Sequence, residues 1–74
     1  MSRWQLNISY EKLWAILQER GISRTKFVHV AKISTNSMVK LGKNEDVQVQ
    51  ILIKICDALN CKIDDIMEYS IELK

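Results

Sequence analysis

The side chains from Ser34 to Ser37 form an unbroken run of small hydrogen-bonding groups in a chain of 74 residues. Met38 and Leu41 follow at a spacing that places both on one side of a helix, whereas Lys40 points the other way. A short helix with an apolar back and a small polar front can enter the major groove of DNA and reach base edges. The segment 23–41 therefore predicts two short helices joined by a tight turn, the second of which binds DNA.

The sequence contains no combination of residues that resembles a catalytic or metal-binding site. Cys56 and Cys61 are separated by four residues and there is one histidine, His29, which falls short of a zinc pattern. Asp64 and Asp65 are interpreted as acids in the first turn of a short helix, where the helix dipole favours them. We therefore expect two structural cysteines and a surface histidine, and no enzyme activity, cofactor, metal or small-molecule ligand.

The composition favours one small helical domain that spans residues 1–74. A chain of this length holds a single domain with a modest core. The absence of Pro and the presence of only two Gly favour helices over a β-rich fold. No leader segment is evident, and no apolar run approaches the ~20 residues of a membrane span. We therefore expect a cytoplasmic protein without a membrane partner.

The charges are unevenly distributed, although the formal net charge of +2 by itself indicates little. The segment from residue 24 to residue 43 holds five Lys or Arg and no acid, while five acids lie in the C-terminal third. This asymmetry predicts a basic face and an acidic end. An ordinary solvated surface explains the same charges equally well.

Three helix starts are indicated by a repeated pattern in which an apolar residue and a serine precede a second apolar residue. The serine can cap the first N–H groups of a helix, and the flanking apolar residues can pack on each other as a hydrophobic staple. The pattern recurs at Ile8-Ser9 with Leu13, Ile22-Ser23 with Phe27, and Ile33-Ser34 with Met38.

Helices are predicted at residues 10–20, 24–32, 35–41 and 48–59, followed by a short fifth helix at 63–67. Apolar residues recur along each at the spacing of one helix face. Gly21 and Gly42 are expected to end the first and third helices, and Asn60 to follow the fourth in a left-handed conformation. Gln48 is a poor cap for the fourth helix. The predicted fold class is therefore all-α with five helices.

The two ends of the chain have a different pattern. Residues 3–8 and 69–73 alternate apolar with polar side chains, which is typical of short strands. Two such strands are marginal alone, so they would pair with each other or with the same segments of a second subunit. Frayed termini are the alternative.

With these features, the chain resembles the Cro/lambda-repressor-like helix-turn-helix family, also called XRE, over about residues 10–69. The resemblance is carried by the helix-turn-helix at 23–41, the loop LGKNEDV and the tail ICDALNCKIDDI. It implies a five-helix DNA-binding domain of the small stand-alone type. Two positions depart from the family pattern, since Lys32 stands where the turn usually has Gly, and Val28 stands where Ala is favoured.

The resemblance implies that residues 35–41 form the recognition helix. Asn can bond adenine through two hydrogen bonds, Thr offers a methyl group to thymine, and Lys reaches guanine acceptors. Ser34 is expected to cap the helix instead. The positions expected to contact bases are Thr35, Asn36, Ser37 and Lys40. Of these, Thr35 and Ser37 have simple solvation as the alternative.

Phosphate contacts are expected from the start of the second helix and from the loop after the third. Such contacts position a protein on DNA without reading the sequence, and they make affinity fall steeply with salt. The residues in these places are Arg24, Thr25, Lys43 and Asn44.

Apolar residues outside the core stripes indicate a second subunit. One small domain reads only a few base pairs, and family members commonly bind DNA as twofold dimers. The residues expected in a homodimer interface are Trp4, Ile51, Ile53 and Ile71. The main alternative function is an antitoxin-like protein-interaction module of the same fold that does not bind DNA, and the acid-free basic stretch argues against it.

Overall fold

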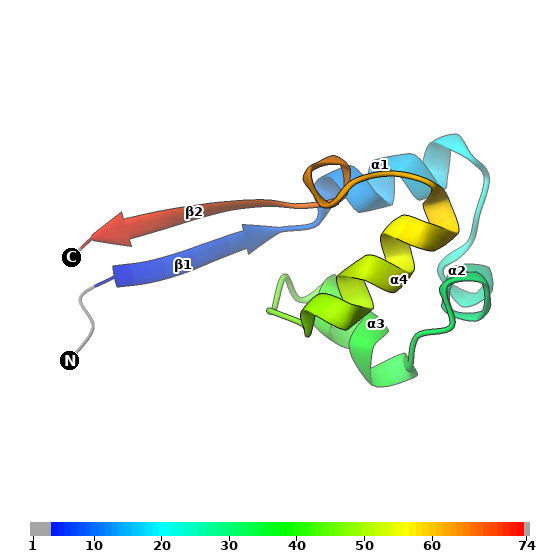
Figure 1. The fold of residues 1–74 in the computed structure, drawn as a ribbon, viewed down its shortest axis with the longest axis horizontal. Coiled ribbons are helices and arrows are strands. Elements are labelled where there is room, and N and C mark those ends of the chain that lie inside the picture. The colour runs from blue at the N-terminus through cyan, green and yellow to red at the C-terminus, as the bar shows by residue number, and fades with distance from the viewer. Residues whose placement is uncertain (1–3, 74) are drawn as a thin grey trace.

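The helices follow one another along the chain, and one strand lies at each end of the described residues. The computed structural model describes residues 4–73. Within these residues, two strands flank four α-helices and a one-turn 3-10 helix (Figure 1). The elements are β1 (Trp4–Ser9), α1 (Glu11–Glu19), α2 (Arg24–Ala31), α3 (Thr35–Gly42), α4 (Val49–Leu59), the 3-10 helix (Ile63–Asp65) and β2 (Glu68–Leu73).

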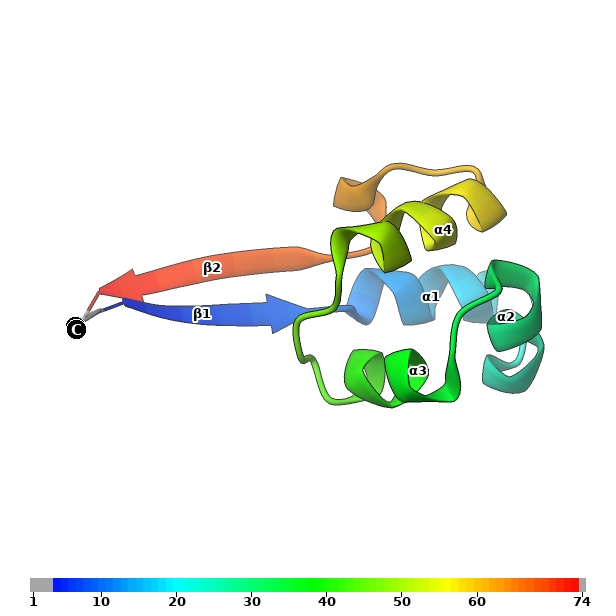
Figure 2. The same cartoon turned by 60° about the horizontal axis from the view of Figure 1, so that its bottom comes forward.

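The four helices form a body, and the two strands form an arm that projects from one end of it (Figures 1 and 2). The strands pair antiparallel, with Trp4 opposite Leu73 and Ser9 opposite Glu68. The termini are thus paired strands of one chain, as the alternation predicted, and each strand is slightly longer at the body end than expected. Residue 3 of the predicted first strand lies outside the described residues.

The core of the body is built from the helix faces that the apolar spacing predicted. Phe27, Leu41 and Ile55 are completely buried and belong to three different helices. Trp14 and Met38 pack against this core from α1 and α3 but are only half-buried. The fully packed set also includes Tyr10, Leu13, Leu17, Ala31, Ile33, Leu52, Leu59 and Ile66.

A residue with positive φ follows each of the four α-helices. In every case the N–H of the next residue donates to the carbonyl five residues earlier, as in a Schellman C-terminus. Gly21 and Asn60 take this conformation after α1 and α4, as predicted. Lys32 takes it after α2 with φ of 56°, so the turn of the helix-turn-helix is left-handed without glycine.

Gly42 is the last residue of α3, so the helix extends one residue beyond the predicted 35–41. Gly42 does not adopt the left-handed conformation that terminates the helix, which falls to Asn44 with φ of 56°. The backbone N–H of Tyr10 donates to Asn44 Oδ1 (3.2 Å), and the Tyr10 hydroxyl donates to the Glu45 carbonyl (2.8 Å). The loop after α3 is therefore clipped to the residue that joins β1 to α1.

Serine caps form at two of the three predicted places. Ser23 Oγ accepts from the Lys26 N–H at the start of α2, and Ser34 Oγ accepts from the Ser37 N–H at the start of α3. The first cap is displaced, because α1 begins at Glu11 and Tyr10 is its N-cap residue. Ser9 Oγ accepts instead from the Glu11 N–H (3.3 Å).

The predicted fifth α-helix is one turn of 3-10 helix. Asp65 closes this turn from both sides, because its N–H donates to the Lys62 carbonyl and its Oδ2 accepts from the Lys62 N–H (3.0 Å). Two residues later the chain enters β2, which leaves no room for a second turn. The fold is accordingly mostly helical, with four α-helices and the two-stranded sheet that the terminal alternation predicted, and the fifth α-helix of the prediction is not confirmed.

Candidate nucleic-acid interface

Helix α3 is fixed to the body from both ends. Ile33 is 6% exposed directly before the helix, and Leu41 is fully buried in its last turn. At the start of the helix the Ser34 and Ser37 hydroxyl oxygens lie 3.0 Å apart and share a hydrogen bond. The cap and the buried side chains hold the outer face of α3 in one orientation, as a base-reading helix requires.

Three of the four residues expected to contact bases share the outer face of α3. Thr35, Asn36 and Lys40 are exposed, whereas Ser37 is half-buried and its hydroxyl bonds to Ser34. Val39 is also 47% exposed and was not expected on this face. Its methyl groups lie three residues from Asn36, on the same side of the helix, where they could meet a thymine methyl.

A hollow of about 330 Å³ lies where the start of α4 meets α3. Asn36 and Lys40 line it together with Gln48, whose carboxamide has the same pairing chemistry as that of asparagine. Sequence reasoning treated Gln48 only as a poor cap, and it makes no side-chain cap hydrogen bond. Ile51 also lines this hollow and is half-buried, so it lies next to the recognition helix.

A second hollow, of about 300 Å³, lies between α2 and α3. Arg24 and Thr25 line it from the first turn of α2, and Thr35 lines it from the first turn of α3. Val28, the bulkier residue at the family's Ala position, is half-buried in its wall. His29 is exposed beside it, as predicted for a surface histidine.

Arg24 is positioned by an aromatic ring. Its guanidinium carbon lies 4.0 Å from the centroid of the Trp14 ring, which is close enough for a cation–π contact. A Cβ placed on Gly42 would lie 3.6 Å from an Arg24 terminal nitrogen, so the guanidinium also sits beside the end of α3. Stacking leaves the N–H edge of an arginine able to bind a phosphate.

The two loop residues expected at phosphates differ in their surroundings. Lys43 is exposed and ends α3, so its ammonium group is accessible to solvent. Asn44 is also exposed, but its side-chain oxygen accepts from Tyr10. Its first role in the structure is therefore to hold the loop, and only its NH₂ group remains for another acceptor.

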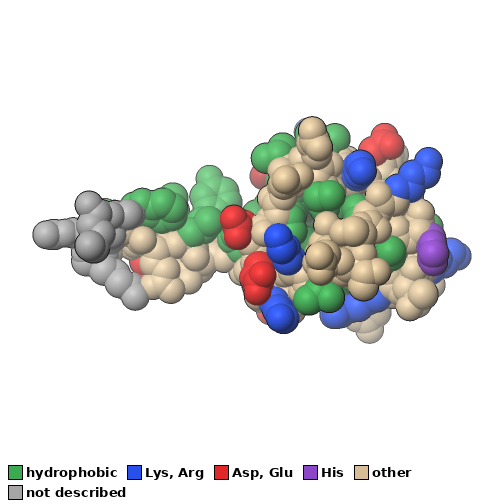
Figure 3. Space-filling view, turned by 90° about the horizontal axis from the view of Figure 1, so that it is seen from below, with side chains coloured by type: hydrophobic (Ala, Val, Ile, Leu, Met, Phe, Trp, Pro, Cys, Tyr) green, Lys and Arg blue, Asp and Glu red, His purple; other side chains and the backbone are tan. Residues whose placement is uncertain are grey.

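Basic side chains are spread over the side of the molecule on which α3 lies. Figure 3 views that side and shows Lys and Arg on the helical body, with acidic groups gathered where the arm begins. The segment from residue 24 to residue 43 carries its five cations and no acid across α2, α3 and the turn between them. The electrostatic field of this segment therefore favours a polyanion.

Comparison with known families identifies this arrangement. A model of the Cro/C1-type helix-turn-helix DNA-binding domain matches residues 12–72. The chain belongs to this family. It is also similar to the crystal structure of transcriptional regulator VanUg, form II, with 37% identity and a TM-score of 0.84 over 90% of this chain and 89% of the other. No curated protein matches the chain.

The family and the structural likeness together make this chain a helix-turn-helix, DNA-binding transcription regulator of the XRE type. Its helix pair is α2 and α3, with Lys32 at the left-handed turn. Among residues 4–73, no helix is both long and apolar enough to span a membrane.

Proposed function

We propose that the chain binds double-stranded DNA in a sequence-specific way by inserting α3 into the major groove. The observation that carries the proposal is the exposed face of Thr35, Asn36 and Lys40 on a capped helix that buried residues anchor at both ends. Asn36 would bond an adenine edge and Lys40 a guanine edge. Thr35 and Ser37 complete the proposed base-contacting set, with Ser37 limited by its bond to Ser34.

The proposed phosphate contacts lie on both flanks of α3. Arg24 and Thr25 stand in the first turn of α2, where the helix dipole also favours an anion. Lys43 and the NH₂ group of Asn44 stand in the loop beyond the other end of α3. Contacts on both flanks would fix the position of the helix along the groove.

We also propose that the protein acts as a homodimer. Two copies read two half-sites about one helical turn apart, which a single domain of this size cannot do. Among the residues expected at the interface, Trp4, Ile53 and Ile71 are more than half exposed. Ile51 is half-buried beside α3 and is the weakest member of the set. We propose further that the protein is a regulator without catalytic activity and that it is located in the cytoplasm, where its DNA lies.

Selection of bound DNA from a random pool tests the proposal directly. The wild type should enrich one sequence, and Asn36→Ala should relax the preference at one base position because a bidentate contact is lost. Lys43→Ala serves as the matched variant. It should weaken all sites alike and reduce the slope of log affinity against log salt by about 0.9.

Two results would contradict this account. Equal effects of Asn36→Ala and Lys43→Ala on sequence preference would mean that the division between base and phosphate contacts is wrong. A wild-type protein that fails to bind any duplex at low salt would favour the protein-interaction module instead.

A further inference from the structure

The arm formed by β1 and β2 has one apolar face. Residues directly opposite each other in an antiparallel pair project to the same side of the sheet. Leu6 lies opposite Ile71, Ile8 opposite Tyr69, and Trp4 opposite Leu73. The alternate pairs are polar and occupy the other face: Gln5 with Glu72, Asn7 with Ser70, and Ser9 with Glu68.

Most of the apolar face is exposed to solvent. Tyr69 is 68% exposed, Ile71 58% and Leu73 85%, and Leu6 and Trp4 continue the row at 40% and 53%. Figure 3 shows hydrophobic side chains gathered along one side of the arm. With roughly 150–250 Å² for each large side chain, the exposed part of this face amounts to roughly 600 Å². That is the size of the largest apolar patches on monomeric proteins, which are often binding sites.

The arm receives little support from the rest of the chain. Its strands contact mainly each other, and they are the two ends of the described chain, joined only through the helical body (Figure 1). An isolated two-stranded ribbon is marginally stable at best in water and needs a further layer on its hydrophobic face. Another surface that covers the apolar face would supply that layer.

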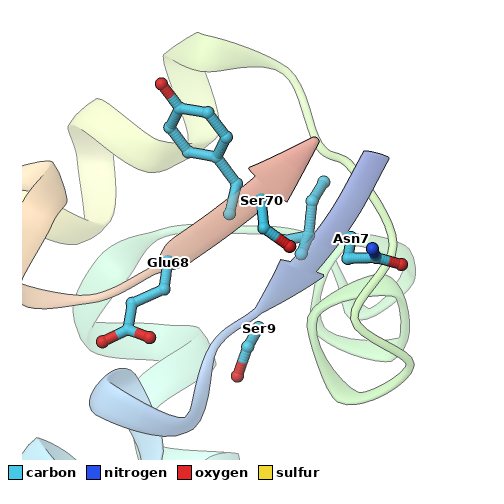
Figure 4. Close-up of a pocket in the computed structure, with 6 residues that line it drawn as sticks. Asn7, Ser9, Glu68 and Ser70 are labelled. Atoms are coloured by element: carbon cyan, nitrogen blue, oxygen red, sulfur yellow. The ribbon is translucent and has the colours of Figure 1, made fainter. Parts of the chain in front are cut away.

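The charge of the arm argues against DNA as the covering surface. Its twelve residues include Glu68 and Glu72 and no basic residue. The polar face carries both carboxylates, and on it Asn7 and Ser70 lie opposite each other on neighbouring strands (Figure 4). A hollow of about 180 Å³ at the body end of the arm is lined from both faces, because Ile8 and Tyr69 border it together with these polar residues. Glu68 is paired with Lys12 of α1 (3.1 Å), and the two strands offer no cation to a polyanion. An uncharged apolar face instead fits another apolar face.

We propose that the apolar face of the arm packs face to face on the same face of a second copy of this chain. A symmetric contact needs a self-complementary surface, and an uncharged row of aliphatic and aromatic side chains is one. Two such faces would bury roughly 1,200 Å² in total, which reaches the lower limit of stable interfaces. This contact would be the interface of the homodimer proposed above, so the inference rests on that part of the proposed function.

The length of the arm suits the spacing of two half-sites. A strand of six residues spans about 20 Å. The longest dimension of the molecule is 41 Å, which leaves roughly 20 Å for the helical body. If two arms overlap fully in opposite directions, the bodies lie at the two ends of this spacer, with centres roughly 40 Å apart. This separation is comparable with the ~34–36 Å between half-sites one turn of DNA apart.

Sedimentation of the full chain over a range of concentrations, without DNA, tests the interface. Ile71→Glu places a charge in the apolar face, and Ser70→Glu places the same charge on the polar face of the same strand. We expect a concentration-dependent dimer whose dissociation constant rises at least ~100-fold in Ile71→Glu, because the substitution occurs twice per dimer. Ser70→Glu should leave it within about threefold of wild type.

A third variant, Ile53→Glu, distinguishes an interface formed by the arm from one formed by α4, because Ile53 lies on α4 and is 56% exposed. A dimer that survives Ile71→Glu but dissociates in Ile53→Glu overturns the proposal, as does a wild type that is monomeric at every concentration. If Ile71→Glu loses helical structure, Leu73→Glu at the end of the arm takes its place. Because these measurements contain no DNA, they test the dimer interface independently of DNA binding. The interface can be refuted while base selection by α3 is confirmed, and base selection can be refuted while the interface is confirmed.

Discussion

Replacing Asn44 with alanine should destabilise the domain by about 2 kcal/mol, although the side chain lies on the surface. Two terms contribute to this value. An alanine in the left-handed conformation that Asn44 adopts costs about 1 kcal/mol. Loss of the oxygen that accepts from the Tyr10 N–H at the start of α1 costs about 1 kcal/mol more, as for other helix caps.

Asn44→Gly separates the two terms. Glycine adopts a positive φ without strain, so this variant loses the hydrogen bond from Tyr10 but keeps the turn. We expect about half the loss of Asn44→Ala. Urea unfolding followed by far-UV circular dichroism gives both values, and thermal unfolding should place Asn44→Ala roughly 8–16 °C below wild type in a domain of this size.

Lys43→Ala is the control, since Lys43 is exposed in the same loop with a negative φ. Its stability should stay within about 0.5 kcal/mol of wild type. Equal losses from Asn44→Ala and Asn44→Gly would show that backbone strain contributes nothing. If both variants lose less than about 0.5 kcal/mol of unfolding free energy, the hydrogen bond between Asn44 and Tyr10 does not stabilise the domain.

Other expected outcomes concern the turn, the stacked arginine and a thiol. Lys32→Gly should stabilise the domain by up to about 1 kcal/mol in urea unfolding by removing left-handed strain, and Lys32→Ala should not. Trp14→Leu should lower DNA affinity several-fold, because Arg24 loses the ring on which it stacks. Arg24→Ala should lower the affinity too, and it should reduce the slope of log affinity against log salt by about 0.9. Burial and the neighbouring Cys61 raise the pKa of Cys56 from 9.0 to about 11. The uncharged Cys56 thiol therefore contributes fully to the stability of the fold below pH 9, and this contribution is lost as the pH rises through about 11. Because little thiolate is present at neutral pH, iodoacetamide should alkylate Cys56 slowly there.

The helices of the body could be predicted from the sequence because their determinants are local. Ser23 and Ser34 cap helices that begin at the next residue, as predicted, and the apolar spacing identified buried positions such as Phe27, Leu41 and Ile55. A cap bonds to a backbone group two or three residues away, so it acts within one turn. These signals fixed the starts of α2 and α3 without knowledge of the tertiary structure.

The end of α3 could not be predicted in the same way. Gly42 and Asn44 can both terminate a helix, and glycine is the usual choice. What selects Asn44 is its bond to Tyr10, which lies 34 residues away in the chain. The same kind of contact, between segments distant in sequence, determines that the two termini form one sheet instead of fraying.

Exposure was the least predictable property of the candidate site. Val39 stays exposed on α3 although it is apolar, and Gln48 reaches the surface around Asn36 because the start of α4 lies beside α3, which no spacing rule describes. Ile51, which a helical wheel places at the edge of the core stripe, is half-buried beside the same hollow. The assignment of Thr35, Asn36 and Lys40 to the outer face followed from helix geometry alone, and their contacts with bases stay a prediction.

Tyr10 links the part of the molecule proposed to dimerise with the part proposed to read DNA. It lies between β1 and α1, it is 1% exposed, and its N–H and its hydroxyl both hold the loop that follows α3. A displacement of the arm would therefore act on the end of α3 through one buried side chain and two hydrogen bonds. If two arms join two copies, the same contacts transmit the dimer geometry to both recognition helices. Half-site spacing would then depend on the rigidity of this junction as much as on the arm itself.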